Sequence, residues 1–323
     1  MTKKPNRNQL IEWDFDKLML DLTATFENEP PQLEFVLPGF LLDSVGVLVS
    51  PGGLGKSMML LQNAISIALG RDVFRLWSLD GITPIAPGRV IIFAVEDPVP
   101  VLQNRMHRLG KELNEEERKL VAARVEIVPV VGLGFSILEA SNGGLHEALV
   151  MQRLKEWAQR DGEKPRLIAF DTLNRCLGGA GENSSTDLGK LMTVAEGLCK
   201  SLGCAALLVH HSDKASAQSR NGQSQFAVRG SSAISDNCRF QMNLSSVSEV
   251  LAAKYGVSDP NIQRRMVRVD VPKLNYAPPL APMMLLRDEE GILRNFEYEM
   301  FGDQSGSEFL MIEFKDDHFG LGL

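Results

Sequence analysis

A glycine-rich stretch followed by lysine and serine is the strongest chemical signal in this chain. Residues 48–57 read Leu-Val-Ser-Pro-Gly-Gly-Leu-Gly-Lys-Ser, which follows the G-x-x-x-x-G-K-S spacing of a phosphate-binding loop. Backbone N–H groups of such a loop curl around a phosphate, which then lies at the positive end of the following helix. The residues expected to contact a nucleotide are Gly52, Gly53, Leu54, Gly55, Lys56, Ser57 and Met58.

Lys56 and Ser57 have distinct expected roles. Lys56 reaches the β- and γ-phosphate oxygens, and Ser57 holds Mg²⁺. The flanking residues fit, because the apolar run Val45–Val49 predicts a buried strand and Ser57–Leu69 predicts a helix that ends at Gly70. The alternative is a glycine-rich turn without a ligand.

A carboxylate at the end of another apolar run is the second expected magnesium ligand. Leu167–Phe170 predicts a buried strand, and Asp171 follows it directly. P-loop NTPases hold Mg²⁺ with such an aspartate, although buried strands often end in Asp for other reasons. The next residue is Thr172, so a general base for hydrolysis must come from elsewhere.

Glu96 is the candidate for that base. The predicted strand Arg89–Ala94 delivers Glu96 near its carboxyl end, where α/β sheets bind ligands. A carboxylate there orients and deprotonates an attacking water. The alternative is an acidic surface turn, in which Asp97 caps the helix that opens at Pro98.

Two adjacent histidines follow the predicted strand Ala205–Val209. A donor at this point, His210 or His211, senses the γ-phosphate and transmits its loss to the polar segment Ser212–Ala227. A structural histidine is the other interpretation. Metal binding by the pair is disfavoured, because no third ligand has suitable spacing.

Composition indicates a soluble globular protein. The 323 residues are 44% hydrophobic and 23% charged, enough for one large core. No apolar stretch approaches a membrane span, so we expect neither export nor membrane insertion. The four cysteines lack paired or metal-ligand spacing, which favours a reducing cytoplasm. A net charge of −7 argues against a surface that coats nucleic acid but is compatible with a small basic channel.

The alternation of apolar runs and helical periods predicts an α/β fold with a mostly parallel central sheet, helices on both faces and an antiparallel C-terminal extension. We expect an N-terminal arm (1–32), a core (33–290) and a C-terminal tail (291–323). The arm contains one amphipathic piece, Leu10–Phe26, which packs on its own domain or contacts a neighbouring subunit. Further predicted strands are Val125–Val128, Phe240–Leu244, Met266–Val271 and Pro282–Leu286, and predicted helices are Val99–Leu113, Gly144–Gln159, Asp187–Leu202 and Ser246–Tyr255.

In their order, these motifs resemble the RecA-like ATPase core and, within it, the hexameric plasmid replicative helicases of the RepA type. The likeness spans about Leu33 to Leu286. It includes the phosphate loop, Phe35-Val36-Leu37-Pro38, Glu96-Asp97-Pro98, Asp171-Thr172-Leu173, His210-His211, Arg229-Gly230-Ser231-Ser232, Asp236-Asn237 and Lys273-Leu274-Asn275-Tyr276. The resemblance implies a homohexameric ring with ATP and Mg²⁺ at each interface and single-stranded DNA through its centre.

The resemblance also implies roles for individual residues. It makes Lys56, Ser57, Glu96 and Asp171 the ATPase centre, Arg239 an arginine finger for a neighbour's nucleotide, Lys273 a second candidate for that action, and Tyr276 a residue that packs on the base. An arginine finger makes hydrolysis depend on assembly. In the plain alternative, these last three residues are exposed strand surface.

Two loops are the expected DNA contacts. They are Leu177–Thr186 and Ser212–Ala227, and the second carries Lys214, Arg220 and Phe226. Because neither loop is strongly basic, we expect weak, sequence-independent and salt-sensitive contacts. A solvated loop without a partner is the alternative.

The sequence therefore predicts an ATP-dependent, ring-forming DNA helicase that moves on single-stranded DNA during replication of a plasmid or similar element, with a primase or initiator protein as a further partner. The alternative is a RecA-like DNA-dependent ATPase that acts as a recombination mediator or regulatory switch without unwinding. A small-molecule kinase is disfavoured, because no acceptor-site cluster is recognisable. A degenerate P-loop protein is disfavoured by the intact ATPase residues.

Overall fold

The computed structural model describes residues 14–78, 85–141, 144–181, 184–211 and 232–301. The chain divides into two units, Met1–Leu33 and Glu34–Leu323. In the first unit, helices α1 (Phe15–Leu18) and α2 (Leu22–Glu27) each begin at an aspartate whose carboxylate accepts a backbone N–H. The single amphipathic piece expected over residues 10–26 is thus two short helices, and residues 10–13 lie outside the described part.

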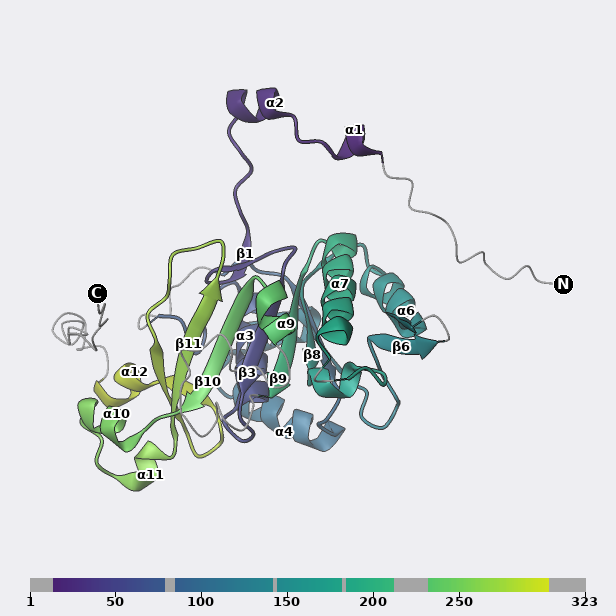
Figure 1. Ribbon diagram of the computed structural model, residues 1–323. Coiled ribbons are helices and arrows are strands. Elements are labelled where there is room, and N and C mark those ends of the chain that lie inside the picture. Colours follow the sequence, from purple (N-terminus) through teal and green to yellow (C-terminus); the bar gives the residue numbers. More distant parts are fainter. Residues whose placement is uncertain (1–13, 79–84, 142–143, 182–183, 212–231, 302–323) are drawn as a thin grey trace, which may run out of the picture. The chain divides into compact units, whose positions relative to one another are not determined.

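The second unit contains a nine-stranded sheet (Figure 1). Its strands are β3 (Val45–Ser50), β4 (Arg89–Ala94), β5 (Val125–Pro129), β8 (Pro165–Asp171), β9 (Ala205–His211), β10 (Phe240–Ser246), β11 (Met266–Leu274), β12 (Met283–Arg287) and β13 (Leu293–Asn295). Their order is β13-β12-β11-β10-β3-β9-β8-β4-β5. The strands from β10 to β5 are parallel, and β11, β12 and β13 are antiparallel. The predicted fold class is confirmed.

Helices cover both faces of this sheet. One face packs against α3 (Lys56–Leu69), α4 (Val99–Gly110) and α5 (Glu115–Arg124), and the other against α6 (Leu149–Ala158) and α7 (Ser185–Leu202). Successive strand residues point to opposite faces. In β9, Leu207 and Val209 therefore join the α3 side, whereas Ala206 and Leu208 join the α7 side.

Helix α3 carries the end of the glycine-rich stretch. It starts at Gly55, which has φ of +100°, and ends at Gly70, which has φ of +75° and donates its N–H to Ser66 O at 2.8 Å. Both conformations are left-handed, where glycine is the favoured residue. Every α3 side chain except those of Ser57 and Leu69 is buried, so the helix is held firmly beneath the loop.

Residues 144–159 differ from the predicted single helix. Gly144–Glu147 forms strand β7, which pairs antiparallel with β6 (Leu138–Ser141), and only α6 is helical. Gly144 has φ of +103°, which no α-helix accommodates. Helix α5 was not predicted, although Asn114 and Glu117 form a capping box at its start.

The C-terminal part of the sheet also differs from expectation in two ways. The antiparallel extension was expected from Phe240 onward, but β10 is parallel to β3 and the extension begins with β11. The sheet also continues beyond the expected core boundary at residue 290, because β13 pairs with β12 and Leu293 is fully buried.

Shorter elements complete the described part. They are β1 (Phe35–Leu37), β2 (Phe40–Leu41), a 3₁₀ turn (Leu173–Cys176), α9 (Ser232–Asn237), α10 (Glu249–Lys254), α11 (Pro260–Gln263) and α12 (Phe296–Phe301). All four cysteines are buried and free. Within the ranges that the structure describes, no helix is both long and apolar enough to cross a membrane.

Candidate nucleotide-binding site

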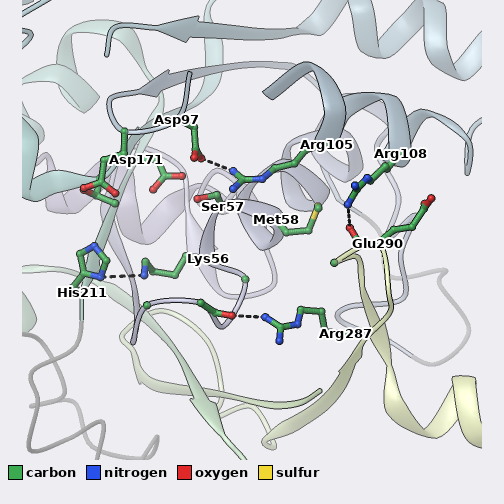
Figure 2. A pocket seen from close by; sticks show the side chains of 16 residues that line it. Lys56, Ser57, Met58, Asp97, Arg105, Arg108, Asp171, His211, Arg287 and Glu290 are labelled. Atoms are coloured by element: carbon green, nitrogen blue, oxygen red, sulfur yellow. Dashed lines mark hydrogen bonds and ion pairs between the residues drawn. The ribbon is translucent and has the colours of Figure 1, made fainter. Parts of the chain in front are cut away.

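A cavity of about 350 Å³ lies at the carboxyl ends of the central parallel strands. Its walls come from the loop after β3, the turn after β4, the ends of β8 and β9, helix α4 and the β12–β13 turn. Figure 2 shows the charged side chains that converge on it. Of the residues predicted from sequence, the lining includes Gly52, Gly53, Gly55, Lys56, Ser57, Met58, Glu96, Asp171 and His211.

The glycine-rich loop departs from the expected spacing at one position. Ser50 stands where the motif has its first glycine, and it is the last residue of β3. Ordinary strand backbone does not need glycine, and the Ser50 hydroxyl donates to Pro51 O at 2.8 Å. Gly53 has φ of +81° and a Cβ there would meet nothing within 4 Å, so its backbone conformation, rather than space, calls for glycine.

Lys56 is folded onto the loop that contains it. Its Nζ donates to Ser50 O and Pro51 O, each at 3.2 Å, and lies 3.3 Å from Nδ1 of His211. Burial lowers the pKa of Lys56, while the charges of Asp171 and Glu96 act in the opposite direction. Lys56 is thus a buried ammonium at the mouth of a helix, which is a favourable place for phosphate.

Asp171 and Ser57 form the part of the site that fits a magnesium ion. Asp171 is 7% exposed, and the Ser57 side chain hydrogen-bonds to it. Within the described residues, Asp171 Oδ1 is buried without a hydrogen-bond partner. Buried polar atoms are normally satisfied, so a carboxylate oxygen left open beside a hydroxyl suits Mg²⁺. When bound between these side chains and the phosphates, Mg²⁺ neutralises charge that develops during phosphoryl transfer.

Burial raises the pKa of Asp171 to about 6, and the nearby carboxylates Asp97 and Glu96 add to that effect against the Ser57 hydrogen bond and Lys56. The folded chain therefore binds this proton more tightly than the unfolded chain. The unfolding free energy falls as pH rises from about 4 to about 6. With about 1.4 kcal/mol per pKa unit, ionised Asp171 costs the nucleotide-free chain on the order of 3 kcal/mol above that window.

Asp171→Asn is accordingly expected to stabilise the nucleotide-free chain at pH 8, by on the order of 2–3 kcal/mol. The gain should shrink toward zero near pH 4, because Asp171 is then protonated in both states. Urea unfolding at several pH values measures this difference. An equal effect of the substitution at pH 4 and pH 8 would contradict the assignment of a raised pKa.

Glu96 lies at the opening of the cavity, where it is oriented by the residue that follows Asp171. The Thr172 hydroxyl donates to Glu96 Oε1 at 2.8 Å, and Arg175 Nε lies 3.7 Å from the same oxygen. Thr172 is 2% exposed, whereas the Glu96 side chain is 38% exposed. Thr172 thus holds a carboxylate that stays accessible to water. The expected helix cap at Asp97 is wrong, since Pro98 is the N-cap and the Asp97 carboxylate pairs with Arg105.

Thr172→Val is expected to lower kcat for ATP about 5- to 20-fold with little change in KM, because Glu96 loses its orienting hydrogen bond while the buried volume is kept. Thr172→Ser retains the hydroxyl and should stay within about 2-fold of wild type. Steady-state hydrolysis assays compare the three chains. A kcat that is the same in Thr172→Val and wild type would exclude an orienting role.

The two histidines lie on opposite faces of the sheet. His211 continues the α3 side of β9 and lines the cavity beside Lys56. His210 is fully buried and, by strand alternation, continues the α7 side. His211 is therefore the histidine placed to contact a γ-phosphate, and the spacing of β9 could have indicated this once its inward face was known.

Three arginines of the cavity were not predicted from the sequence. Arg105 and Arg108 come from α4, and Arg287 comes from the end of β12. Arg105 pairs with Asp97, Arg108 donates to Glu290 O at 2.6 Å, and Arg287 donates to Gly53 O. No local motif marks these residues; an amphipathic analysis of α4 could have found only the first two.

The residues expected to act on a neighbour's nucleotide lie away from the cavity. Arg239 N donates to Val45 O, at the start of β3, whereas the phosphate loop follows the end of that strand. Five strand steps separate these points by about 16 Å. Figure 1 shows α9, which precedes Arg239, at the opposite end of the sheet from α4. The Arg239 side chain is exposed.

Lys273 and Tyr276 are also outside the cavity. Lys273 Nζ donates to Ser235 O at 2.5 Å and to Asp236 O at 2.8 Å, so it caps the end of α9 in its own chain. Tyr276 is 42% exposed and follows β11 at the amino edge of the parallel strands, so packing on the base of its own chain's nucleotide is not supported. Leu54 belongs to the loop but does not line the cavity. Lys214, Arg220 and Phe226 lie outside the described residues.

The fold and the site together define a P-loop nucleoside-triphosphatase with a RecA-like core. A family model described as AAA domain matches residues 15–217, which is more than half of the chain. The chain belongs to the AAA domain family. A solved structure of the ATPase domain of a helicase is similar in fold, with a TM-score of 0.56 and 11% identity. That match covers 88% of this chain and 99% of the other.

Proposed function

We propose that this chain is an ATP-dependent, ring-forming DNA helicase that translocates on single-stranded DNA during replication of a plasmid or similar element. One observation carries the proposal: the nucleotide cavity and the exposed Arg239 lie at opposite edges of one sheet. A single chain therefore presents a phosphate-binding half-site at one edge and an exposed cation at the other. Head-to-tail association of such chains brings the two together and closes into a ring.

The cavity residues supply the chemistry of hydrolysis in this proposal. Lys56 binds the β- and γ-phosphates, Ser57 and Asp171 hold Mg²⁺, and Glu96 orients and deprotonates the attacking water. His211, 3.3 Å from Lys56, is the sensor of the γ-phosphate. Arg239 of the neighbouring subunit stabilises the charge that develops on the transferred phosphoryl group.

Release of the γ-phosphate reaches DNA through the segments that follow the strand ends. His211 is the last residue of β9, and the expected DNA loop at 212–227 begins directly after it. The other expected loop follows β8 and the 3₁₀ turn and ends where α7 begins. Both connect to strands whose ends contact the nucleotide, which gives hydrolysis a short covalent path to the DNA.

The N-terminal unit provides a second element for assembly. Six of its large apolar side chains are 56–82% exposed: Phe15, Leu18, Met19, Leu20, Leu22 and Phe26. Short helices that leave this much apolar surface in water normally cover it against another surface. We assign this arm to a subunit contact in the ring. A primase or initiator protein is the proposed additional partner, and the cytoplasm the proposed location.

A forked duplex tests the proposal against its alternative, a DNA-dependent ATPase that binds without unwinding. The helicase displaces one strand of the fork in the presence of ATP and Mg²⁺, and Glu96→Gln abolishes displacement while preserving DNA binding. If single strands stimulate hydrolysis but no strand is released at any protein concentration, the mediator or switch is the correct function. The Mg²⁺ requirement is checked by repeating the assay with EDTA.

A further inference from the structure

The β12–β13 hairpin forms one wall of the nucleotide cavity and is fixed to the ATPase core on three sides. Gln62 of α3 exchanges two hydrogen bonds with the Leu293 backbone, at 2.7 and 3.0 Å, and is itself fully buried. Arg108 of α4 donates to Glu290 O at 2.6 Å, and Lys111 pairs with the Glu290 carboxylate at 3.0 Å. The hairpin is therefore a rigid part of the site.

Arg287 is the cation that this hairpin directs at the phosphate loop. Its backbone N–H donates to Arg265 O at 2.9 Å, and its carbonyl accepts from Arg265 Nε at 2.7 Å, so the position of its main chain is fixed. Its side chain extends to Gly53 O in the crest of the loop (Figure 2). Figure 2 shows this guanidinium reaching the loop from a different side than Lys56.

The charge of Arg287 differs from that of the other cavity arginines in its surroundings. Arg105 is neutralised by Asp97, and Glu290, which binds Arg108 through its carbonyl, also brings a carboxylate close to that arginine. For Arg287, the described residues provide one side-chain hydrogen bond, to a neutral carbonyl, and no carboxylate within ion-pair distance. A guanidinium carries five N–H donors, so most of its binding capacity remains open to the cavity.

We propose that Arg287 binds the phosphate chain of the nucleoside triphosphate in its own subunit, opposite Lys56. This inference rests on the proposed function of the cavity and adds a residue of the same chain to it. An arginine offers planar, charge-assisted hydrogen bonds to phosphate oxygens, which a point charge such as Lys56 does not. The phosphate chain would be held between α3 and the C-terminal hairpin before any neighbour contributes.

Equilibrium binding of a non-hydrolysable ATP analogue with Mg²⁺, in the absence of DNA, tests the assignment on the full chain. Arg287→Ala is expected to raise the Kd about 10- to 100-fold. Arg287→Lys keeps the charge without the fork and should show a smaller loss. Arg264→Ala removes an exposed arginine outside the cavity and should leave the Kd unchanged.

Arg287→Gln separates phosphate binding from a structural tie to the loop. Glutamine retains an N–H donor for Gly53 O but has no charge, so it should bind the analogue as weakly as Arg287→Ala. Recovery of wild-type affinity by Arg287→Gln would overturn the proposal, because the hydrogen bond to Gly53 would then suffice.

Inorganic tripolyphosphate identifies the part of the nucleotide that Arg287 contacts. Its inhibition constant against the analogue should rise in Arg287→Ala by the same factor as the Kd. An unchanged inhibition constant would place Arg287 at the base or ribose and overturn the proposal. These measurements use no DNA, so their failure is distinguishable from failure of strand displacement, which would refute the helicase function alone.

Discussion

Lys56→Ala should reduce ATP turnover at least about 100-fold while the chain folds normally. The ammonium is the cation closest to the helix N-terminus, and its hydrogen bonds go to Ser50 O and Pro51 O of its own loop rather than to the hydrophobic core. Its removal therefore takes charge from the phosphates without opening a cavity in the packed interior. Steady-state hydrolysis, together with a circular dichroism melting curve, measures both effects.

Lys254→Ala is the matched control for this substitution. Lys254 is exposed at the end of α10 and does not line the cavity. Its removal changes the net charge equally and should leave turnover unchanged. Retained turnover in Lys56→Ala would refute the placement of Lys56 against the phosphates, and equal losses in both variants would indicate a general charge effect.

Assemblies that contain both Arg239→Ala and Glu96→Gln chains should recover activity that neither variant has alone. An Arg239→Ala chain keeps its own cavity intact, and a Glu96→Gln chain still offers Arg239 to its neighbour. In co-expressed random mixtures, one order of neighbours in four restores a complete site, so up to about one quarter of wild-type turnover per chain is expected. Hydrolysis rates over a series of mixing ratios measure it.

Co-assembly of Glu96→Gln with Lys56→Ala controls for non-specific rescue. Both residues act on the nucleotide of their own chain in this account, since both line one cavity. No mixing ratio should therefore restore turnover. Rescue in this pair, or its absence at every ratio in the Arg239→Ala pair, would argue against completion of the site by a neighbour.

The centre of the fold was predictable because its signals are local. Strands β3, β4, β8 and β9 are continuous apolar runs, and the residues that follow them lie at the same edge of a parallel sheet. That rule is enough to bring the phosphate loop, Glu96 and Asp171 together from the sequence alone. It also places two histidines at the end of β9, but only the face of the strand selects His211.

Features that depend on distant pairing were missed. Residues 144–147 have a helical pattern and become a strand because residues 138–141 pair with them. Arg287 reaches the phosphate loop only because β11 and β12 reverse the chain twice and return it to the carboxyl edge. No spacing in the sequence encodes such a return. Lys273 shows the opposite error, since its bonds within its own chain were not foreseen.

Turnover per chain during dilution tests most directly whether one subunit completes the nucleotide site of the next. Native mass is measured at each concentration, with nucleotide present, so that the rate is compared with the assembled fraction. The account predicts that turnover per chain falls in step with the loss of assemblies and that isolated chains still bind nucleotide without hydrolysing it. A single chain in solution that hydrolyses ATP at the full rate would contradict it.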